Sequence, residues 1–186
     1  MAATESTMLP LGTTAPDFSL PDTVSGKEIA LSAVQSDQAT VVMFLCNHCP
    51  FVKHVNPELV RLANDYQPRG VSFLAISSND VENYPQDSPE LMKEAAGQLG
   101  YSFPYLYDED QSVARAYQAA CTPDFFIFDP QMRLVYRGQL DSSRPGNDVP
   151  VTGENIRAAL DAIMAGEPVV EKQRPSIGCN IKWKAM

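Results

Sequence analysis

The sequence predicts an α/β protein in which a mixed central sheet carries helices on both faces. Short apolar runs rich in β-branched and aromatic residues, typical of buried strands, occur at 40–45, 71–76 and 125–128. Segments with apolar residues at helical spacing lie between them, at 51–66 and 89–99. The order is strand, helix, strand, helix, helix, strand hairpin and closing helix. That order is typical of a sheet covered on two sides.

The first part of the chain divides into a loose leader, a hairpin, a strand and a helix, over residues 1–14, 15–31, 40–45 and 51–66. The hairpin is expected because turn residues at 24–27 separate two short apolar segments. Pro57 falls inside the helical segment. It either kinks one helix or begins a second helix that Asn56 caps.

The second part of the chain contains a strand, a capped helix, a short strand, a weak helix, a strand hairpin and a closing helix, over residues 71–76, 88–99, 103–107, 111–120, 125–138 and 156–165. Ser88 followed by Pro89 is a typical helix start. No repeat or linker interrupts the chain. We therefore predict one domain over 1–186, with a core at about 15–165 and a tail at 166–186 that Trp183 anchors in an apolar groove.

Composition excludes several classes of function. The net charge of −9 and the pI near 4.6 argue against binding to nucleic acid or to an anionic membrane. No basic, apolar leader resembles a signal peptide, and no apolar run approaches the ~20 residues of a membrane span. Four cysteines in 186 residues are too few for a disulfide scaffold. We expect a soluble, cytoplasmic protein, in a compartment that keeps thiols reduced or lets them cycle.

The motif Cys46-Asn47-His48-Cys49-Pro50 connects a predicted strand to a predicted helix. Proline suits the first turn of a helix, where its missing N–H costs nothing. The unpaired N–H groups and the dipole at a helix start favour thiolate over thiol. Free cysteines are commonly inert and buried, but a Cys-x-x-Cys pair at such a turn favours redox chemistry.

Three motifs carry a resemblance to a known family: Ala15-Pro-Asp-Phe-Ser-Leu20, Cys46-Asn-His-Cys-Pro-Phe51 and Cys121-Thr-Pro-Asp-Phe-Phe-Ile-Phe-Asp129. Over about 15–165 the chain resembles the thioredoxin-fold superfamily. Within it, the chain is similar to peroxiredoxin-like proteins related to alkyl hydroperoxide reductases and thiol-specific antioxidant proteins. The resemblance implies a three-layer thioredoxin-like fold with an N-terminal β-hairpin extension. It also implies a cis bond at Thr122-Pro123 beside the two cysteines, where backbone groups pair with an incoming peptide.

The resemblance leaves open which cysteine attacks. By analogy with thioredoxins, Cys46 is the exposed nucleophile and Cys49 resolves the mixed disulfide. By analogy with peroxiredoxins, Cys49 attacks peroxide and Cys46 condenses with the sulfenic acid. The supporting residues are His48, Pro50, Thr122 and Pro123. Two additional redox thiols are candidates: Cys121 is either a third redox thiol or a packed small residue, and Cys179 is either a remote resolving cysteine or a residue of the tail.

Departures from both patterns guide the functional prediction. Val42 and Cys46 stand where peroxiredoxins carry Pro and Thr or Ser, and Thr40 and Leu45 stand where thioredoxins carry Asp and Trp. We predict a thiol–disulfide oxidoreductase with weak peroxide reduction. Its substrates are protein or small-molecule disulfides or hydroperoxides, and its external electron donor is a thioredoxin or glutathione system. No cofactor, metal, nucleic acid or membrane partner is predicted. Asp124, next to Pro123, is a candidate proton carrier, but a surface or capping role is expected for it.

Two other classes of function use the same residues. A zinc or copper protein would draw ligands from Cys46, Cys49, Cys121 and either His48 or His54. A paired second Cys-x-x-Cys, usual in structural zinc sites, is absent from the sequence. A non-catalytic interaction module would keep the fold without the chemistry. Measurement of disulfide reduction separates the enzyme from this module, and metal analysis tests the zinc or copper protein.

Overall fold

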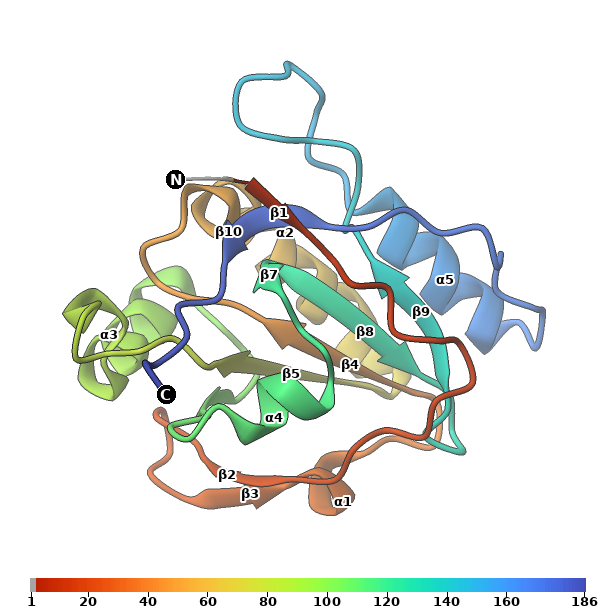
Figure 1. Cartoon of the computed structure of the whole chain (residues 1–186). Helices are drawn as coiled ribbons and strands as arrows, with labels where there is room; N and C mark the ends of the chain where they lie inside the picture. The colour runs from red at the N-terminus through yellow and green to blue at the C-terminus, as the bar shows by residue number, and fades with distance from the viewer. Residues whose placement is uncertain (1–2) are drawn as a thin grey trace.

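The central sheet of the computed structural model, which describes residues 3–186, has five strands (Figure 1). They lie in the order β6 (Tyr105–Tyr107), β5 (Val71–Ser77), β4 (Ala39–Phe44), β8 (Asp124–Phe128) and β9 (Leu134–Gly138). β4 and β6 are parallel to β5, whereas β8 is antiparallel to β4 and β9. The mixed sheet predicted from the sequence is confirmed.

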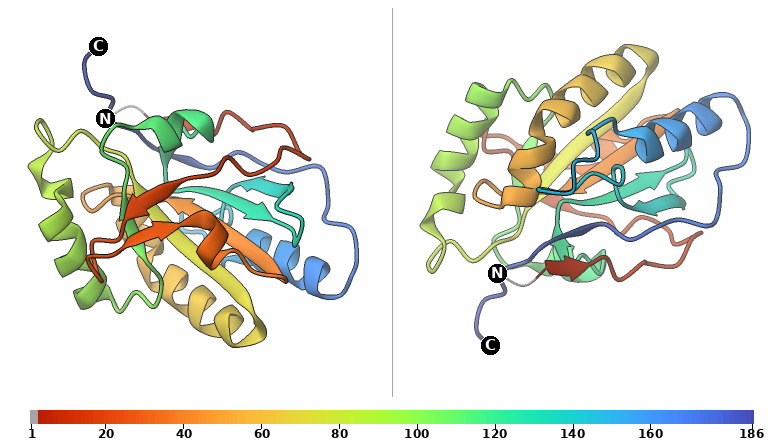
Figure 2. Two further views of the ribbon diagram at one scale, coloured as in Figure 1. Left: turned by 90° about the horizontal axis from the view of Figure 1, so that it is seen from below. Right: turned by 90° about the horizontal axis from the view of Figure 1, so that it is seen from above.

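Helices cover both faces of this sheet, as Figures 1 and 2 show. One face packs against α2 (Pro50–Tyr66), α3 (Pro89–Leu99) and α5 (Glu154–Met164), and the other against α1 (Leu31–Val34) and α4 (Ser112–Ala116). All six residues of β4 are buried. Its side chains alternate, with Val41 and Met43 on the α2 side and Val42 and Phe44 on the α4 side. The three-layer thioredoxin-like arrangement is confirmed.

The predicted N-terminal hairpin is present as β2 (Ser19–Pro21) and β3 (Glu28–Ala30). Ser88 caps α3 by accepting a hydrogen bond from Leu91 N–H, as its sequence predicts. The helix predicted over 111–120 is limited to α4, and Gln118 adopts a positive φ of 52° soon after its end. Two short 3-10 helices, η1 (Gln67–Arg69) and η2 (Pro85–Asp87), complete the connections.

α2 is one continuous helix of 17 residues with Pro57 inside it. The alternative of a second helix capped by Asn56 is wrong. The Asn56 side chain instead accepts a hydrogen bond of 2.6 Å from Tyr101 Oη. Pro57 is on the exposed face of the helix, while Leu59 and Leu62 are buried against the sheet. Within residues 3–186, no helix combines the length and the apolar character that crossing a bilayer requires.

A small separate sheet joins the two ends of the chain to the middle. Its order is β1 (Ala3–Glu5), β10 (Ile177–Asn180) and β7 (Cys121–Thr122), with both pairings antiparallel. Figure 1 shows β1 and β10 side by side. The prediction that 1–14 is a loose leader is therefore wrong from residue 3 onward, and residues 1 and 2 lie outside the described range. A three-residue strand is too short to show a period of two in its sequence.

The tail is held differently from the prediction. Trp183 is 42% exposed. The Arg115 guanidinium lies over the Trp183 ring, with its Cζ 5.2 Å from the ring centroid. The side chain that is buried is Ile181, which belongs to the core cluster on the α4 side of the sheet. The expected apolar groove for Trp183 is therefore wrong. Polar and apolar contacts of the residues just before it anchor the tail.

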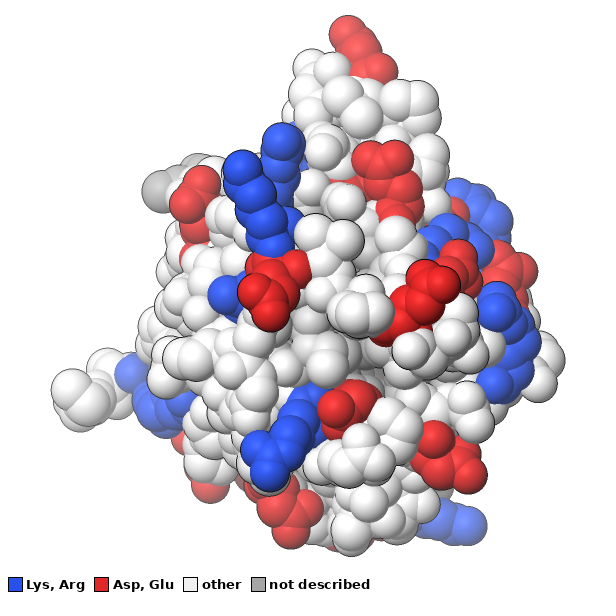
Figure 3. All heavy atoms as spheres, turned by 90° about the vertical axis from the view of Figure 1, so that its right-hand side faces the viewer, with Lys and Arg blue, Asp and Glu red and all other residues white. Residues whose placement is uncertain are grey.

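An ion pair fixes α5 against α2. Arg157 Nη2 lies 2.8 Å from Glu58 Oε1, and Arg157 Nη1 lies 2.8 Å from Asp65 Oδ2. Glu58 is buried, so the arginine compensates a carboxylate that has left water. Figure 3 shows acidic and basic side chains interspersed over the face that includes α5. The net charge of −9 does not make this face uniformly acidic.

Candidate redox site

The Cys-x-x-Cys motif lies at the turn from β4 to α2, as predicted. Cys49 is the N-cap of α2, with φ −70° and ψ 125°, and Pro50 is the first helical residue. Cys46 and Cys49 are 2% and 0% exposed. The expectation of an exposed Cys46 is wrong, because the segment around Thr122 and the tail strand β10 lie against the motif.

The Thr122-Pro123 peptide bond is cis, which confirms the expectation from the resemblance. This peptide bond brings two groups of Thr122 to the cysteines. Thr122 Oγ1 lies 3.5 Å from Cys46 Sγ, and Thr122 O lies 3.3 Å from Cys49 Sγ. The supporting residues at 122 and 123 therefore lie at the sulfur atoms.

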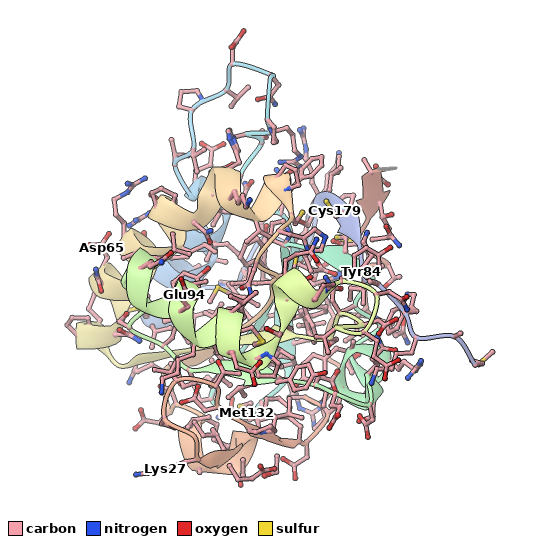
Figure 4. All side chains as sticks on the ribbon, turned by 90° about the vertical axis from the view of Figure 1, so that its left-hand side faces the viewer. Lys27, Asp65, Tyr84, Glu94, Met132 and Cys179 are labelled. Atoms are coloured by element: carbon pink, nitrogen blue, oxygen red, sulfur yellow. The ribbon has the colours of Figure 1, made fainter. Side chains whose placement is uncertain are left out.

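A third cysteine reaches the same place from the end of the chain. Cys179 on β10 pairs with Thr122 on β7, and its Sγ lies 2.7 Å from Cys49 Sγ. Figure 4, in which Cys179 is labelled, views this side of the molecule. Cys179 is 3% exposed. Of the two additional thiols expected from the sequence, the structure places this one in contact with the motif.

The environment of the sulfurs places negative charge on Cys49. The pKa of Cys49 is lowered to about 5, first by a hydrogen bond from the Cys46 thiol and then by hydrogen bonds from the Cys179 thiol and the Val52 N–H. The pKa of Cys46 is raised because its thiol donates to Cys49, because it is buried and because Asp87 is near. Burial raises the pKa of Cys179 to about 12. One thiolate therefore lies between two thiols.

Cys121 does not join this group. Its Sγ lies 3.6 Å from Pro123 O and 4.0 Å from Ser176 O. It is fully buried, and burial raises its pKa well above that of an ordinary thiol. Among the described residues, its sulfur contacts two carbonyl oxygens and no other thiol, whereas Cys49 Sγ contacts the Cys179 thiol.

Asp87 is a site residue that the sequence analysis missed. It is fully buried, and its Oδ1 accepts a hydrogen bond of 2.8 Å from Asn47 N–H. Its Oδ2 accepts a hydrogen bond of 2.9 Å from Asn79 Nδ2. The same oxygen lies 2.6 Å from His48 Nδ1, a short contact that is poorly aligned for a hydrogen bond. Asp87 directly precedes Ser88, the N-cap of α3, and an acidic residue there is ordinary. The sequence therefore contains no signal that Asp87 belongs to the site.

Ligand atoms of Cys46, His48 and Asp87 lie within 4.8 Å of one another. This set differs from the metal ligands expected from the sequence. His54 Nε2 is instead 2.7 Å from Ser143 Oγ. Of the two histidines, His48 alone lies in this group, with its ring stacked on Tyr84 at a centroid distance of 5.7 Å.

Asp124 lies directly after the cis proline and is 1% exposed, so the surface or capping role expected for it is wrong. Ser6 Oγ donates a hydrogen bond of 2.8 Å to its Oδ1. No group among the described residues pairs with its Oδ2. Burial raises the pKa of this carboxyl to about 7. The strand predicted at 125–128 could have indicated this burial, because Asp124 is the first residue of β8, and all residues of β8 are buried.

Fold and site together define a thioredoxin-fold protein with a dithiol at the start of its first long helix and a cis proline beside it. The family comparison assigns this class more narrowly. The chain belongs to the AhpC/TSA family, whose model matches residues 11–137.

Three relatives extend this assignment. The solved structure of an uncharacterized conserved protein from Geobacillus kaustophilus is 67% identical, with a TM-score of 0.99 over 100% of this chain and 98% of that chain. The solved structure of a hypothetical protein from Sinorhizobium meliloti 1021 is 48% identical, with a TM-score of 0.96 over 98% of this chain and 100% of that chain. The thiol-disulfide oxidoreductase ResA of Geobacillus thermodenitrificans is 29% identical over 86% of this chain and 82% of its own length. The chain is thus a distant homologue of thiol-disulfide oxidoreductases.

We predict that the reduced protein contains a thiolate down to about pH 5, because hydrogen bonds from two thiols and a backbone N–H stabilise the charge on Cys49. Thiolate absorbance at 240 nm, followed during acid titration, should show a transition near that pH. Cys49→Ser should lose the transition, and the matched variant Cys121→Ser should keep it. A wild-type transition that occurs only near the ordinary thiol pKa would contradict the assignment.

We predict that Asp124 makes the folded protein less stable as pH rises from about 4 to about 7. In this range the buried carboxyl keeps a proton that the unfolded chain has released, so the free energy of unfolding falls with pH. Urea unfolding at pH 5 and pH 8 should show that Asp124→Asn removes a loss on the order of a few kcal/mol. The exposed Asp37→Asn variant should follow the wild type. Equal pH slopes for Asp124→Asn and the wild type would be inconsistent with this role.

Proposed function

We propose that this protein is a thiol–disulfide oxidoreductase that exchanges the dithiol of Cys46 and Cys49 with a substrate disulfide. The observation that supports this most is the lowered pKa of Cys49 at the start of α2, with the Cys46 thiol as its first hydrogen-bond donor. A nucleophile and a resolving thiol in contact are what disulfide exchange requires. The distant homology to ResA supports the same class.

Cys49 is the attacking residue in this proposal. Its thiolate attacks one sulfur of the substrate disulfide, forms a mixed disulfide and releases the other substrate sulfur as a thiolate. Cys46 then loses its proton and attacks Cys49 Sγ. The Cys46–Cys49 bond forms, and the second substrate sulfur leaves and takes up the proton. An external thiol donor, a thioredoxin or glutathione system, reduces the Cys46–Cys49 disulfide by the same exchange and restores the dithiol.

Weak peroxide reduction is a finer part of the proposal. Cys49 holds the position that the peroxiredoxin analogy assigns to the peroxide-attacking thiol, and its pKa is lowered. Its thiolate would take one oxygen of a hydroperoxide, become a sulfenic acid and release the alcohol. Cys46 would condense with the sulfenic acid and release water. The buried surroundings and the departures at Val42 and Cys46 favour a slow reaction.

The reductive half of this proposal predicts that the wild type, supplied with dithiothreitol, accelerates the reduction of insulin disulfides. Cys49→Ser should lose essentially all of this acceleration, because the attacking thiolate is gone, and Cys46→Ser should lose most of it. Cys121→Ser is the matched control and should stay close to the wild type. An inactive wild type, as a non-catalytic interaction module would give, would overturn the proposed function.

Metal binding is a second candidate function, and the cluster of Cys46, His48 and Asp87 favours it. Cysteine, histidine and carboxylate together suit zinc. Metal binding is placed second, after disulfide exchange, because of one distance in the cluster. His48 Nδ1 and Asp87 Oδ2 are 2.6 Å apart, whereas two atoms that bind the same zinc ion at ~2 Å in tetrahedral geometry lie about 3 Å or more apart. A metal ion would have to separate this pair.

Metal binding predicts near-stoichiometric zinc in protein purified without chelator, and less than a tenth of that in His48→Ala and Asp87→Asn, because each variant removes one ligand. Plasma mass spectrometry measures the metal content. His54→Ala is the matched control, since its ring bonds to Ser143 away from the cluster. A wild type without bound zinc after incubation with the ion would exclude this function.

A further inference from the structure

We propose that the tail strand β10 is a built-in substrate strand, whose Cys179 forms a disulfide with Cys49. The proposal rests on the proposed function, because disulfide exchange at the motif supplies the oxidation. It adds a third redox thiol. It also assigns β10 the place that the chain of an external substrate would take.

The position of β10 is the first argument. An extended peptide can add to the edge of a strand through backbone hydrogen bonds, and β7 beside the cis proline offers such an edge. Here β10 takes that place, because Cys179 pairs with Thr122 and Asn180 pairs with Cys121. Gly178 passes so close that a Cβ would lie 1.9 Å from Thr122 O. The close passage requires a glycine, so the strand is fitted to this edge.

The sulfur atoms are the second argument. Cys179 Sγ lies 2.7 Å from Cys49 Sγ, in a place from which water is excluded. Cys49 therefore has a thiol partner on each side, Cys46 from its own motif and Cys179 from the tail. A cysteine on a paired extended strand, facing the attacking sulfur, has the position of a substrate cysteine.

The contacts beyond β10 are the third argument, because they hold the strand in register. Asp80 N–H donates a hydrogen bond of 2.8 Å to Lys182 O. Lys182 N–H donates one of 2.9 Å to Asn79 Oδ1. The Gln111 amide donates 2.9 Å to Lys182 O as well. Tyr84 lies between the tail and the motif, with Lys182 Nζ 5.6 Å from its ring and His48 stacked on it (Figure 4).

The chemical step is an exchange without net oxidation. The Cys46–Cys49 disulfide forms when the protein reduces a substrate. Cys179 loses its proton and attacks Cys49 Sγ, so the Cys49–Cys179 bond forms and the Cys46–Cys49 bond breaks. The electron pair goes to Cys46, which takes up the proton and ends as a thiol. The tail strand is then bound covalently across the site.

The experiment uses the full chain with Cys46→Ser, so that Cys179 is the remaining partner of Cys49. Ellman's reagent, an aromatic disulfide, forms an adduct on Cys49, and Cys179 should displace it. Mass spectrometry should find Cys49 linked to Cys179 and no adduct on either residue. The double variant Cys46→Ser, Cys179→Ser should keep a stable adduct on Cys49. A Cys46→Ser protein with an adduct on Cys49 and an unlinked Cys179 would overturn the proposal.

The outcomes separate this proposal from the proposed function. If the wild type reduces insulin and links Cys46 to Cys49, while Cys46→Ser carries only adducts, the built-in substrate strand is wrong and the proposed function stands. If Cys46→Ser links Cys49 to Cys179 while the wild type does not reduce insulin, the internal pair stands and the proposed function is wrong.

A second variant tests the place of the strand. Gly178→Ala puts a methyl group against Thr122 O and should push β10 from β7. Alkylation of Cys49 by iodoacetamide should become several-fold faster, and the yield of the Cys49–Cys179 link should fall. Gly97→Ala is the matched control, because a Cβ there meets nothing within 4 Å. An unchanged rate of Cys49 alkylation in a folded Gly178→Ala protein would overturn the role of β10 in covering the site. If Gly178→Ala does not fold, the Cys46→Ser experiment decides the redox role of Cys179.

Discussion

The chemistry of this protein depends on where α2 begins. Cys49 is the N-cap of that helix, so its sulfur lies near the backbone N–H groups of the first turn, where the helix dipole favours negative charge. The Val52 N–H is one of the groups that lower its pKa. The start is fixed from both sides, because β4 ends at Phe44 in the middle of the sheet and Pro50 favours a first helical position. A shift of the start by one residue would remove the sulfur from these donors.

Three buried thiols compete for one negative charge. Burial raises the pKa of each, and hydrogen bonds to the charged form oppose that effect. Cys49 receives such bonds from both neighbours and from the backbone, whereas Cys46 and Cys179 donate theirs. A second thiolate in contact with the first would meet like charge in a site without water. The contacts therefore favour negative charge on one sulfur, that of Cys49, which the spacing of the motif left undecided.

Local sequence patterns predicted much of this fold. The runs at 40–45, 71–76 and 125–128 each became a central strand, since short apolar runs between turn residues have few other solutions. The turn from β4 to α2 followed from Pro50 and from the pattern on either side of it. The cis bond before Pro123 came from the resemblance rather than from the residues.

The missed features depend on contacts between distant segments. β1 pairs with β10, which brings Ser6 against Ser176, 170 residues away in sequence. Neither short strand carries a period of its own, so no window of sequence contains the information. Ser6 reaches the buried Asp124 from that first segment, and Asp87 reaches the motif because η2 folds back upon it. The lowered pKa of Cys49 could not be predicted either, because it depends first on the contact with Cys46 and then on Cys179 at the other end of the chain.

The interactions that complete the small sheet also close the site. β7 has two residues, and β10 pairs along its edge at the point where Cys179 contacts Cys49. A buried thiolate reacts with a large substrate only when the structure opens locally, and the free energy of that opening limits the reaction. The opening here concerns one short strand and the hydrogen bonds of Lys182, while the central sheet stays intact. The reactivity of the dithiol is therefore coupled to the stability of the tail.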